Sequence, residues 1–417
     1  MRKSILVVGG GVIGLCCAYY AHQHGHEVTL LERSSPNHKG CSLGNAGYVS
    51  PSHFVPLSSP GMVGYGLRLL SDPESPFSIR PSLDAHLIEW GYRFMRACSP
   101  KHTEKSAPLL RDLNLMSRAC YEEFSEQFGG EFGFTKRGLF NLCKTEAKLE
   151  HEIHLAEHGN RIGVLAEVLT PKQIAERDPN IQMDVIGGVY FPQDAHLIPQ
   201  RFVALLTEYL IKNGVEIRWE TEVTDWKTSR RGIKSVLTNK GEFTAQEYVV
   251  AGGAWSPSIV QPLNLNLPLQ AGKGYSMTLA NPRQRPETPA ILTEARVAVT
   301  PMGSQLRFAG TMEVMGLDLS INRNRVNGII KSIPKYYPEF QTSDFTEEPV
   351  WSGLRPCSPD GLPYIGRTRR YANLSVATGH AMLGLSMAPI TGKLVSEVLS
   401  DERPSLNLTA LSPDRYD

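Results

Sequence analysis

The first residues whose types and spacing indicate a chemical function are three glycines, Gly9, Gly11 and Gly14, and an acid, Glu32. Gly9 permits a tight turn, Gly11 lets the backbone approach a pyrophosphate, and Gly14 lets a helix pack closely against a strand. The N-terminus of that helix presents N–H groups and a partial positive charge to the phosphates. The Glu32 carboxylate can accept both hydrogen bonds from an adenosine ribose that carries no 2′-phosphate. The spacing therefore predicts a dinucleotide site that takes FAD or NAD rather than NADP.

Residues 5–32 supply the elements that position these groups: a strand, a glycine turn, a helix and a second strand that ends at the acid. The alternative is a membrane or targeting segment, because residues 4–21 are mostly apolar and about long enough to span a bilayer. Four glycines interrupt that run, and no small-residue cleavage site follows it. We therefore reject a signal peptide and expect a protein that is not secreted.

The composition argues against several classes of function. The chain has 417 residues, enough for two domains, and its 43 basic and 42 acidic residues give a net charge of +1 without a basic block, which argues against nucleic-acid binding. The seven cysteines form no CxxC pair and no metal-ligand spacing, which suits reduced thiols in a cytoplasm. His22, His24 and His26 resemble a metal tract, but they lie where the first helix is expected to end at Gly25. We predict a solvated helix end there and no metal site.

Pieces of an α/β nucleotide-binding unit recur at two later places in the chain. The small residues at 251–254 end one of the expected strands and would let a nucleotide lie close to the sheet. A simple NAD domain would keep alternating strand and helix after the second piece, whereas this chain continues as a meander. The expected elements are a helix over 200–213, strands over 215–223, 233–238 and 247–253, and a C-terminal strand and helix over 374–379 and 386–399.

Two insertions separate these pieces. Residues 56–195 carry helical patterns, including an amphipathic face that runs from Leu109 to Phe128. Residues 265–350 carry β-like runs, such as YSMTL, VAVTP and LRFAGTM. We expect both insertions to build one sheet-based cap, whose interface with the nucleotide unit would be the substrate cleft.

Six stretches together resemble the D-amino-acid oxidase-like flavoenzymes, and the likeness is strongest to the bacterial D-amino-acid dehydrogenases. Glycine oxidases, sarcosine oxidases and D-hydroxyproline dehydrogenases are further relatives. The resemblance covers nearly the whole chain, with weaker support in residues 60–195. The matching motifs are VVGGGVIGLCCAYY (7–20), SLGNAGYVSP (42–51), VVAGGAWSP (249–257), GKGYSMTL (272–279), WSGLRPCSPDGLPYIG (351–366) and TGHAMLGLSMAPITG (378–392).

The resemblance implies an α/β fold with a discontinuous Rossmann-like FAD-binding domain and a second, α+β substrate or cap domain built on a mixed sheet. The FAD-binding domain would comprise residues 1–55, 196–264 and 351–417, and the cap residues 56–195 and 265–350.

FAD is the cofactor that the resemblance implies. Sarcosine oxidases tether their flavin through a cysteine whose place Gly353 occupies here, with Cys357 four residues beyond, so we expect non-covalent FAD, although a link to a histidine near the N-terminus is left open. The residues expected to contact FAD are Gly9, Gly11, Val12, Ile13, Gly14, Glu32, Arg33, Ser42, Asn45, Ala46, Gly47, Val223, Ala251, Gly252, Gly253, Trp255, Gly353, Arg355, Gly379, His380, Met382, Leu383, Gly384 and Leu385.

Arg355, in the WSGLRP motif, corresponds to the residue that binds the substrate carboxylate in the family. A guanidinium is always charged and forks bidentately onto a carboxylate, so it can hold a substrate Cα over flavin N5. Tyr275 resembles the aromatic residue that lines or gates the substrate pocket, and Tyr48 and His53 are further candidates for the cleft by position. Asp360 lies in a Ser-Pro-Asp-Gly turn, and we assign it to structure.

The predicted reaction is oxidation of the Cα–N bond of a D-amino acid, or of a relative such as D-proline or D-hydroxyproline, to an imine that water converts to a 2-oxo acid. Hydride would pass from Cα to flavin N5, and no side chain announces itself as a strong base. The HAMLG segment lacks the arginine of HFRNG in glycine oxidase-like sequences, which favours the dehydrogenase branch. The alternatives are a glycine- or sarcosine-type oxidase that forms hydrogen peroxide and a non-catalytic flavin-binding protein.

The sequence leaves the electron acceptor open among quinone, another carrier and oxygen, and it does not reveal the oligomeric state. Residues 56–70 are apolar and rich in glycine and proline. We favour a buried cap element there, with a peripheral contact on the inner face of the membrane as the alternative.

Overall fold

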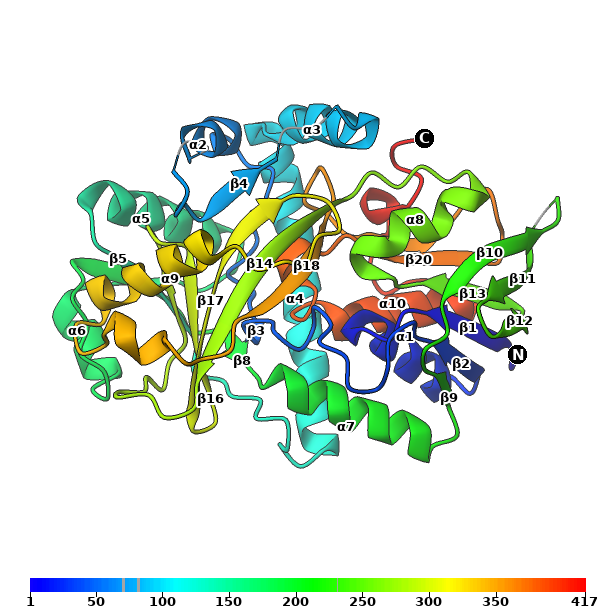
Figure 1. The fold of residues 1–417 in the computed structure, drawn as a ribbon, viewed down its shortest axis with the longest axis horizontal. Helices are drawn as coiled ribbons and strands as arrows, with labels where there is room; N and C mark the ends of the chain where they lie inside the picture. Colours follow the sequence, from blue (N-terminus) through cyan, green and yellow to red (C-terminus); the bar gives the residue numbers. More distant parts are fainter. Residues whose placement is uncertain (70–71, 81–82, 231) are drawn as a thin grey trace.

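The computed structural model describes residues 1–69, 72–80, 83–230 and 232–417, which form two sheet-centred halves joined by long helices (Figure 1). The first half holds a six-stranded sheet in the order β19-β20-β13-β1-β2-β9, parallel except for β19. Its strands are β1 (Ser4–Val8), β2 (Glu27–Leu31), β9 (Glu216–Arg218), β13 (Glu247–Val250), β19 (Tyr364–Arg367) and β20 (Leu374–Thr378). This sheet is the predicted Rossmann-like unit.

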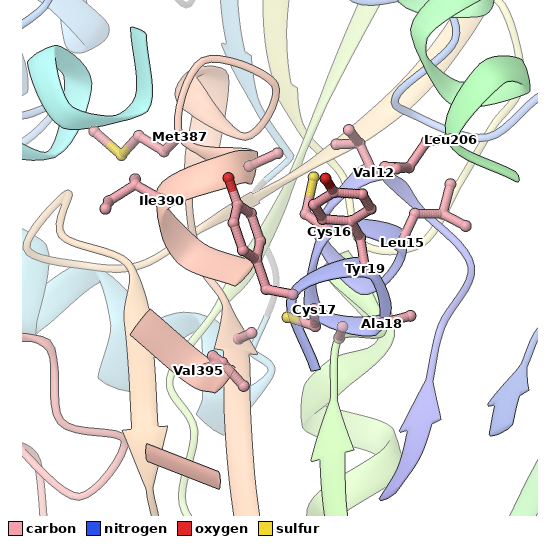
Figure 2. Packing of buried hydrophobic residues seen from close by; sticks show 14 of the residues in the cluster. Val12, Leu15, Cys16, Cys17, Ala18, Tyr19, Leu206, Met387, Ile390 and Val395 are labelled. Atoms are coloured by element: carbon pink, nitrogen blue, oxygen red, sulfur yellow. The ribbon is translucent and has the colours of Figure 1, made fainter. Parts of the chain in front are cut away.

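Helix α1 (Val12–Gln23) lies at the centre of this half, between α10 (Ala388–Leu399) and α7 (Pro199–Lys212) (Figure 2). Every residue of α1 from Gly14 to Ala21 is buried, so this helix packs on all sides rather than through one apolar stripe. Gly392 of α10 has no room for a side chain, because a methyl group there would collide with the backbone of Cys16. The last helix therefore packs directly against the backbone of the first.

The second half is built on nine described strands in the order β18-β14-β17-β16-β15-β5-β7-β6, with β4 paired to β17. The sheet is mixed, because the β15–β5 and β17–β4 pairs are parallel and the other pairs antiparallel. The strands are β4 (Phe77–Ile79), β5 (Leu139–Cys143), β6 (Glu167–Leu169), β7 (Gly187–Phe191), β14 (Gln270–Leu279), β15 (Ala290–Leu292), β16 (Val297–Met302), β17 (Gln305–Val314) and β18 (Trp351–Cys357). The mixed sheet and its helices confirm the predicted fold class.

Smaller elements complete the two halves. Helix α9 packs its apolar side, including Ile329 and Ile333, against the mixed sheet. A three-stranded meander and a two-stranded pair also form, the second of which joins residues just after the expected flavin loop to residues near 195. These elements are β3 (Tyr48–Val49), β8 (Ala195–His196), β10 (Val223–Thr228), β11 (Ile233–Thr238), β12 (Gly241–Phe243), α4 (Pro100–Gln127), α5 (Glu146–Arg161), α6 (Pro171–Arg177), α8 (Ser256–Val260) and α9 (Arg323–Tyr336).

Strand β18 carries Arg355 and lies where the two halves meet. The sequence places residues 351–417 in the FAD-binding segment, yet β18 pairs along its length with β14 of the mixed sheet. The chain then crosses to the six-stranded sheet at β19. Arg355 therefore lies on the mixed sheet beside the crossing between the two halves.

An arm made of α2 (Met62–Leu69), β4 and α3 (Ala85–Ala97) covers one end of the molecule (Figure 1). It includes most of the segment 56–70, whose last residue lies outside the described residues. The expectation that this segment is buried is wrong for α2, where only Gly66 is buried and Leu67 is 64% exposed. Within the described ranges, none of the helices combines the length and apolar character needed to cross a bilayer.

Candidate active site

One cavity of about 990 Å³ lies between the two halves of the molecule. It is wide enough to take a dinucleotide and a small substrate together. Every predicted site residue lines it except Gly14, Gly47 and Gly379. The lining residues that the sequence singled out are Gly9, Gly11, Val12, Ile13, Glu32, Arg33, Ser42, Asn45, Ala46, Tyr48, His53, Val223, Ala251, Gly252, Gly253, Trp255, Tyr275, Gly353, Arg355, His380, Met382, Leu383, Gly384 and Leu385.

The glycine turn has the geometry that a pyrophosphate loop needs. Gly9 has a φ of 113°, which L side chains rarely adopt, and a methyl group on Gly14 would collide with the Gly9 carbonyl. Gly14 thus stays outside the cavity because it is the point where α1 packs onto the turn. Glu32 is 9% exposed, and its carboxylate accepts hydrogen bonds from Gly10 N (2.7 Å) and Ser34 N (2.8 Å). Both oxygens keep a second lone pair for a ribose hydroxyl, so the turn fits the adenosine end of FAD.

The loop over residues 42–47 is held in place from both halves. Ser42 Oγ accepts a hydrogen bond from Val12 N at the start of α1 (3.0 Å), and Asn45 Oδ1 accepts one from Gly47 N (2.8 Å). From β17, Arg307 Nη1 donates to the carbonyls of Leu43 (3.1 Å) and Asn45 (2.7 Å). Arg307 was not among the predicted site residues, because its only signal in the sequence is a cation within the run LRFAGTM. Burial lowers the pKa of Arg307 to about 10.

Arg355 presents an unpaired guanidinium to the cavity. Its Nη1 donates to the carbonyl oxygen of Thr311 (2.7 Å), and within the described part of the chain no carboxylate lies at ion-pair distance. Burial lowers the pKa of Arg355, which the Cys41 and Cys357 thiols partly offset. Thr311 has a φ of 69°, a left-handed conformation that is strained for a β-branched residue. The remaining donors of Arg355 are available for a ligand carboxylate.

Tyr275 lines the cavity, but its hydroxyl is hydrogen-bonded to other residues of the protein. The hydroxyl donates to Glu313 Oε2 (2.5 Å) and accepts from Asn322 N (3.1 Å). Glu313 is 1% exposed and lies 3.4 Å from Arg325 Nε and 3.7 Å from Lys273 Nζ. Burial raises the pKa of Tyr275, as does the bond to Glu313. This buried cluster, which the sequence analysis missed, fixes the ring rather than offering its hydroxyl to a ligand.

Tyr48 and His53 both line the cavity and follow the 42–47 loop. The Tyr48 hydroxyl donates to the carbonyl oxygen of Ala290 (2.7 Å) and accepts from Val299 N (3.0 Å), so the cap sheet already holds it. His53 Nδ1 lies 3.0 Å from Ser52 Oγ, which in turn donates to Asp194 Oδ2 (2.6 Å). The sequence analysis missed Asp194, which has no motif of its own and is placed only by the pairing of β3 with β8.

The C-terminal loop brings a buried histidine to the opposite wall. His380 Nε2 lies 2.9 Å from Thr391 Oγ1, and His380 Nδ1 is buried with no hydrogen-bond partner among the described residues. Burial lowers the pKa of His380 to about 3, so the ring is neutral at physiological pH. An unpaired buried nitrogen is costly unless a ligand meets it. Gly379 lies behind this wall, where a methyl group would collide with the Tyr364 ring.

Trp351, the first residue of the WSGLRP motif, and Arg296, which lies in none of the six motifs, also line the cavity. A methyl group on Gly44 or on Gly353 would collide with the Trp351 indole, so this ring joins the 42–47 loop to β18. Arg296 stacks on the Tyr65 ring of α2 at 4.2 Å. Asp360, which the sequence assigns to structure, does not line the cavity, and Arg415 binds its carboxylate through Nε (2.8 Å) and Nη2 (2.9 Å).

Comparisons with known proteins agree with this architecture. A family model described as FAD dependent oxidoreductase matches residues 4–398. A D-amino acid dehydrogenase of Vibrio atlanticus is 31% identical over 99% of this chain and 100% of its own length. One from Helicobacter pylori is 29% identical over 96% of each chain.

Two solved structures show the same fold. A glycine oxidase from Geobacillus kaustophilus superposes with a TM-score of 0.79 at 23% identity, covering 100% of this chain and 99% of its own. An L-proline dehydrogenase from P. horikoshii has a TM-score of 0.74 at 19% identity, covering 100% and 98%.

Proposed function

Because this chain belongs to the family of FAD-dependent oxidoreductases, and FAD is its cofactor, we propose that it oxidises the Cα–N bond of a D-amino acid. Curated relatives named D-amino acid dehydrogenase over their full length support this choice of substrate class. Within that class we favour the cyclic D-proline and D-hydroxyproline type. FAD, when bound, supplies the acceptor of two electrons and a hydride at its N5 position.

The unpaired guanidinium of Arg355 is the observation that carries the proposal. A charged group is buried in a cavity wall only when something compensates it, and among the described residues the one hydrogen-bond acceptor of the guanidinium is the Thr311 carbonyl oxygen. A substrate carboxylate would supply the missing charge through a bidentate bond. That bond would fix the direction in which Cα presents its hydrogen.

The walls on the cap side favour a compact apolar side chain. Ala298, Ala309 and Gly310 line the cavity from β16 and β17 and leave room for a small ring. The acids that line the cavity, in the part of the chain that is described, are Glu32 and Glu222 on the nucleotide side. A D-arginine or D-lysine side chain would therefore find no counter-charge beside the cap, whereas a D-proline ring needs none.

The C-terminal loop is suited to stabilise the negative charge that reduction places on the flavin ring. His380 is neutral, so its unpaired Nδ1 can carry a proton and donate a hydrogen bond when Nε2 accepts from Thr391. The short helix η4 (Ala381–Leu383) follows directly and brings further backbone N–H groups to the cavity wall.

The exposed face of the arm beside the cavity bears on which acceptor takes electrons from the reduced flavin. Leu67, Ile88 and Met95 are 64%, 57% and 55% exposed on α2 and α3, and the cationic residues Arg68 and Arg96 lie among them. Such a face suits a peripheral contact with an anionic membrane surface and delivery of electrons to quinone. Sedimentation with anionic liposomes tests this contact, and failure to bind at low salt would favour a soluble carrier or oxygen.

The visible spectrum of the purified protein under anaerobic conditions tests the reaction. D-proline and cis-4-hydroxy-D-proline are expected to bleach the flavin band faster than D-alanine, sarcosine or glycine. Fast bleaching by glycine or sarcosine, with hydrogen peroxide formed in air, would instead identify an amine oxidase of that type. A flavin band that no amine bleaches would indicate a non-catalytic flavin-binding protein.

A further inference from the structure

Three side chains near the cavity form a continuous hydrogen-bonded chain that ends at a buried carboxylate. Asp194 precedes β8, and the pairing of β8 with β3 places it under the loop that carries Ser52 and His53. Asp194 Oδ1 accepts from Ser52 N (3.0 Å), and Oδ2 accepts from Ser52 Oγ (2.6 Å). Ser52 Oγ also lies 3.0 Å from His53 Nδ1. His53 lines the cavity, whereas Ser52 and Asp194 are buried behind it.

Which atom donates and which accepts in each of these hydrogen bonds follows from the number of protons available. The Ser52 hydroxyl has one proton and gives it to the carboxylate, so towards His53 its oxygen can only accept. His53 Nδ1 must therefore carry the imidazole proton. Nε2 then keeps its lone pair and has no hydrogen-bond partner within the described residues. The arrangement leaves an unpartnered acceptor on a ring that lines the cavity.

Within the described residues no cation lies at ion-pair distance from the carboxylate at the end of this hydrogen-bonded series, and only the more distant Arg118 lowers its pKa through its charge. Asp194 is 1% exposed, and burial raises its pKa to about 7 against the two hydrogen bonds from Ser52. Burial likewise lowers the pKa of His53 to about 4, so its ring is neutral at physiological pH. The titratable and charged groups that face the pair are Glu152 on α5, Arg118 on α4, Tyr48 on β3 and Tyr190 on β7.

A D-amino acid in water carries an ammonium group, and hydride can leave Cα only after nitrogen has recovered its lone pair. We propose that His53, Ser52 and Asp194 form a proton relay that takes this ammonium proton, with His53 as a catalytic residue and Ser52 and Asp194 as its relay partners. The inference rests on the proposed function, because it assigns a path for a proton that the oxidation of an amino acid must release.

The relay moves one proton without any change in electrons. An N–H bond of the ammonium breaks as one forms at His53 Nε2. The Nδ1–H bond of His53 breaks as one forms at Ser52 Oγ, and the original Ser52 O–H bond breaks as one forms at Asp194 Oδ2. The ammonium becomes a neutral amine and the carboxylate a carboxylic acid. Burial in the cavity favours the transfer, because it lowers the pKa of the bound amine.

Asp194→Asn is the sharpest test, because it changes the proton count while it keeps the shape. An asparagine amide would donate to Ser52 Oγ, the Ser52 proton would turn to His53 Nδ1, and Nε2 would become a donor facing the cavity. The rate of anaerobic flavin reduction at neutral pH is expected to fall about a hundredfold or more. It should recover at alkaline pH, where the substrate amine is already neutral in solution.

Ser52→Ala, which removes the hydroxyl between His53 and Asp194, should likewise slow flavin reduction at neutral pH and recover at alkaline pH. Ser58→Ala is the matched control, since Ser58 is fully buried on the same loop, does not line the cavity and lies outside the chain. The wild-type kcat/KM should rise with pH as Asp194 ionises near pH 7. Both relay variants should lack that rise and follow only the ionisation of the free amine. Reduction rates in both variants that match wild type across the pH range would overturn the relay.

Infrared difference spectroscopy supplies a readout that needs no turnover. The ligand 2-aminoisobutyrate has an ammonium group but no hydrogen on Cα, so it cannot be oxidised, and isobutyrate has the same shape without the amine. At mildly alkaline pH, 2-aminoisobutyrate is expected to produce the C=O band of a protonated carboxylic acid in the wild type and none in Asp194→Asn. Absence of that band in the wild type, or its appearance with isobutyrate, would overturn the relay. A wild type that no amino acid reduces would instead refute the proposed function.

Discussion

Gly274 offers a way to move Arg355 without removing it. Gly274 is buried on β14, opposite Gly353 in the pairing with β18. A methyl group added there would lie closer than 3.0 Å to Nη1, Nη2 and Cζ of Arg355, a separation that real Cβ atoms do not show. The atoms in the way are the far end of a flexible side chain, so in Gly274→Ala the guanidinium rather than the backbone is expected to yield.

The size of the effect follows from the displacement. To reach ordinary contact distance the guanidinium must move by roughly 1 Å, and a misplacement of that size at a positioning group costs about a hundredfold in rate. That factor corresponds to about 2.7 kcal/mol of transition-state stabilisation. The loss should appear mainly in kcat/KM for the amino acid, because Arg355 would hold the carboxylate in both the ground state and the transition state.

The assay is the steady-state rate with D-proline and an artificial electron acceptor, measured for the wild type and four variants. Gly64→Ala is the control, since a methyl group there meets nothing within 4 Å and the site lies on exposed α2. In an Arg355→Ala background, Gly274→Ala should cost nothing further, because the group that it displaces is gone. A Gly274→Ala enzyme with wild-type kcat/KM, or an equal loss in the Arg355→Ala background, would refute the role of Arg355.

Three further predictions concern the cofactor and the stability of the fold. Glu32→Ala leaves two N–H groups without their acceptor and should weaken FAD binding about tenfold or more, as measured by flavin fluorescence on titrating the apoprotein; unchanged affinity would contradict the assignment. Arg415→Ala leaves the Asp360 carboxylate buried and uncompensated, and chemical denaturation should show a loss of about 3–5 kcal/mol. Burial raises the pKa of Asp360, but Arg415 outweighs it and holds the pKa below 3.8, so this loss should shrink as pH falls through the folded-state value; a difference that is the same at every pH would argue against it. Asp194→Asn should raise Tm relative to wild type at alkaline pH. Burial raises the pKa of the Asp194 carboxyl from 3.8 to about 7, so the wild type loses stability as pH rises between these two values. A Tm gain as large in strong acid would contradict this cause.

The nucleotide-binding half could be predicted from sequence because its signals are local. The glycines, the acid and the small residues after β13 each follow from a backbone requirement within a few positions of the chain. Helix α7 at Pro199–Lys212 and strand β20 at Leu374–Thr378 lie within a residue or two of the predicted 200–213 and 374–379. The predicted strand over 215–223 is shorter, because β9 ends at Arg218 and the meander begins at Val223.

The cap and its polar groups could not be predicted in the same way, because their partners are distant in sequence. Asp194 meets Ser52 across 142 positions, and Arg307 meets Asn45 across 262. Neither residue carries a motif, and only the paired strands bring them together. The prediction that residues 56–70 are buried failed for a related reason. An apolar composition indicates that a segment is covered, but not whether the cavity, a membrane or the core covers it.

The order of strands in the six-stranded sheet has a consequence for biosynthesis. Its central neighbours β1, β13 and β20 come from residues near 8, 250 and 376, so a growing chain cannot close this sheet until almost all of it has left the ribosome. Contacts so far apart in sequence make folding slow and leave unpaired strand edges exposed meanwhile. Nascent chains that stop before Leu374 lack both β20 and α10, and should occupy chaperones rather than accumulate as a partly active fragment.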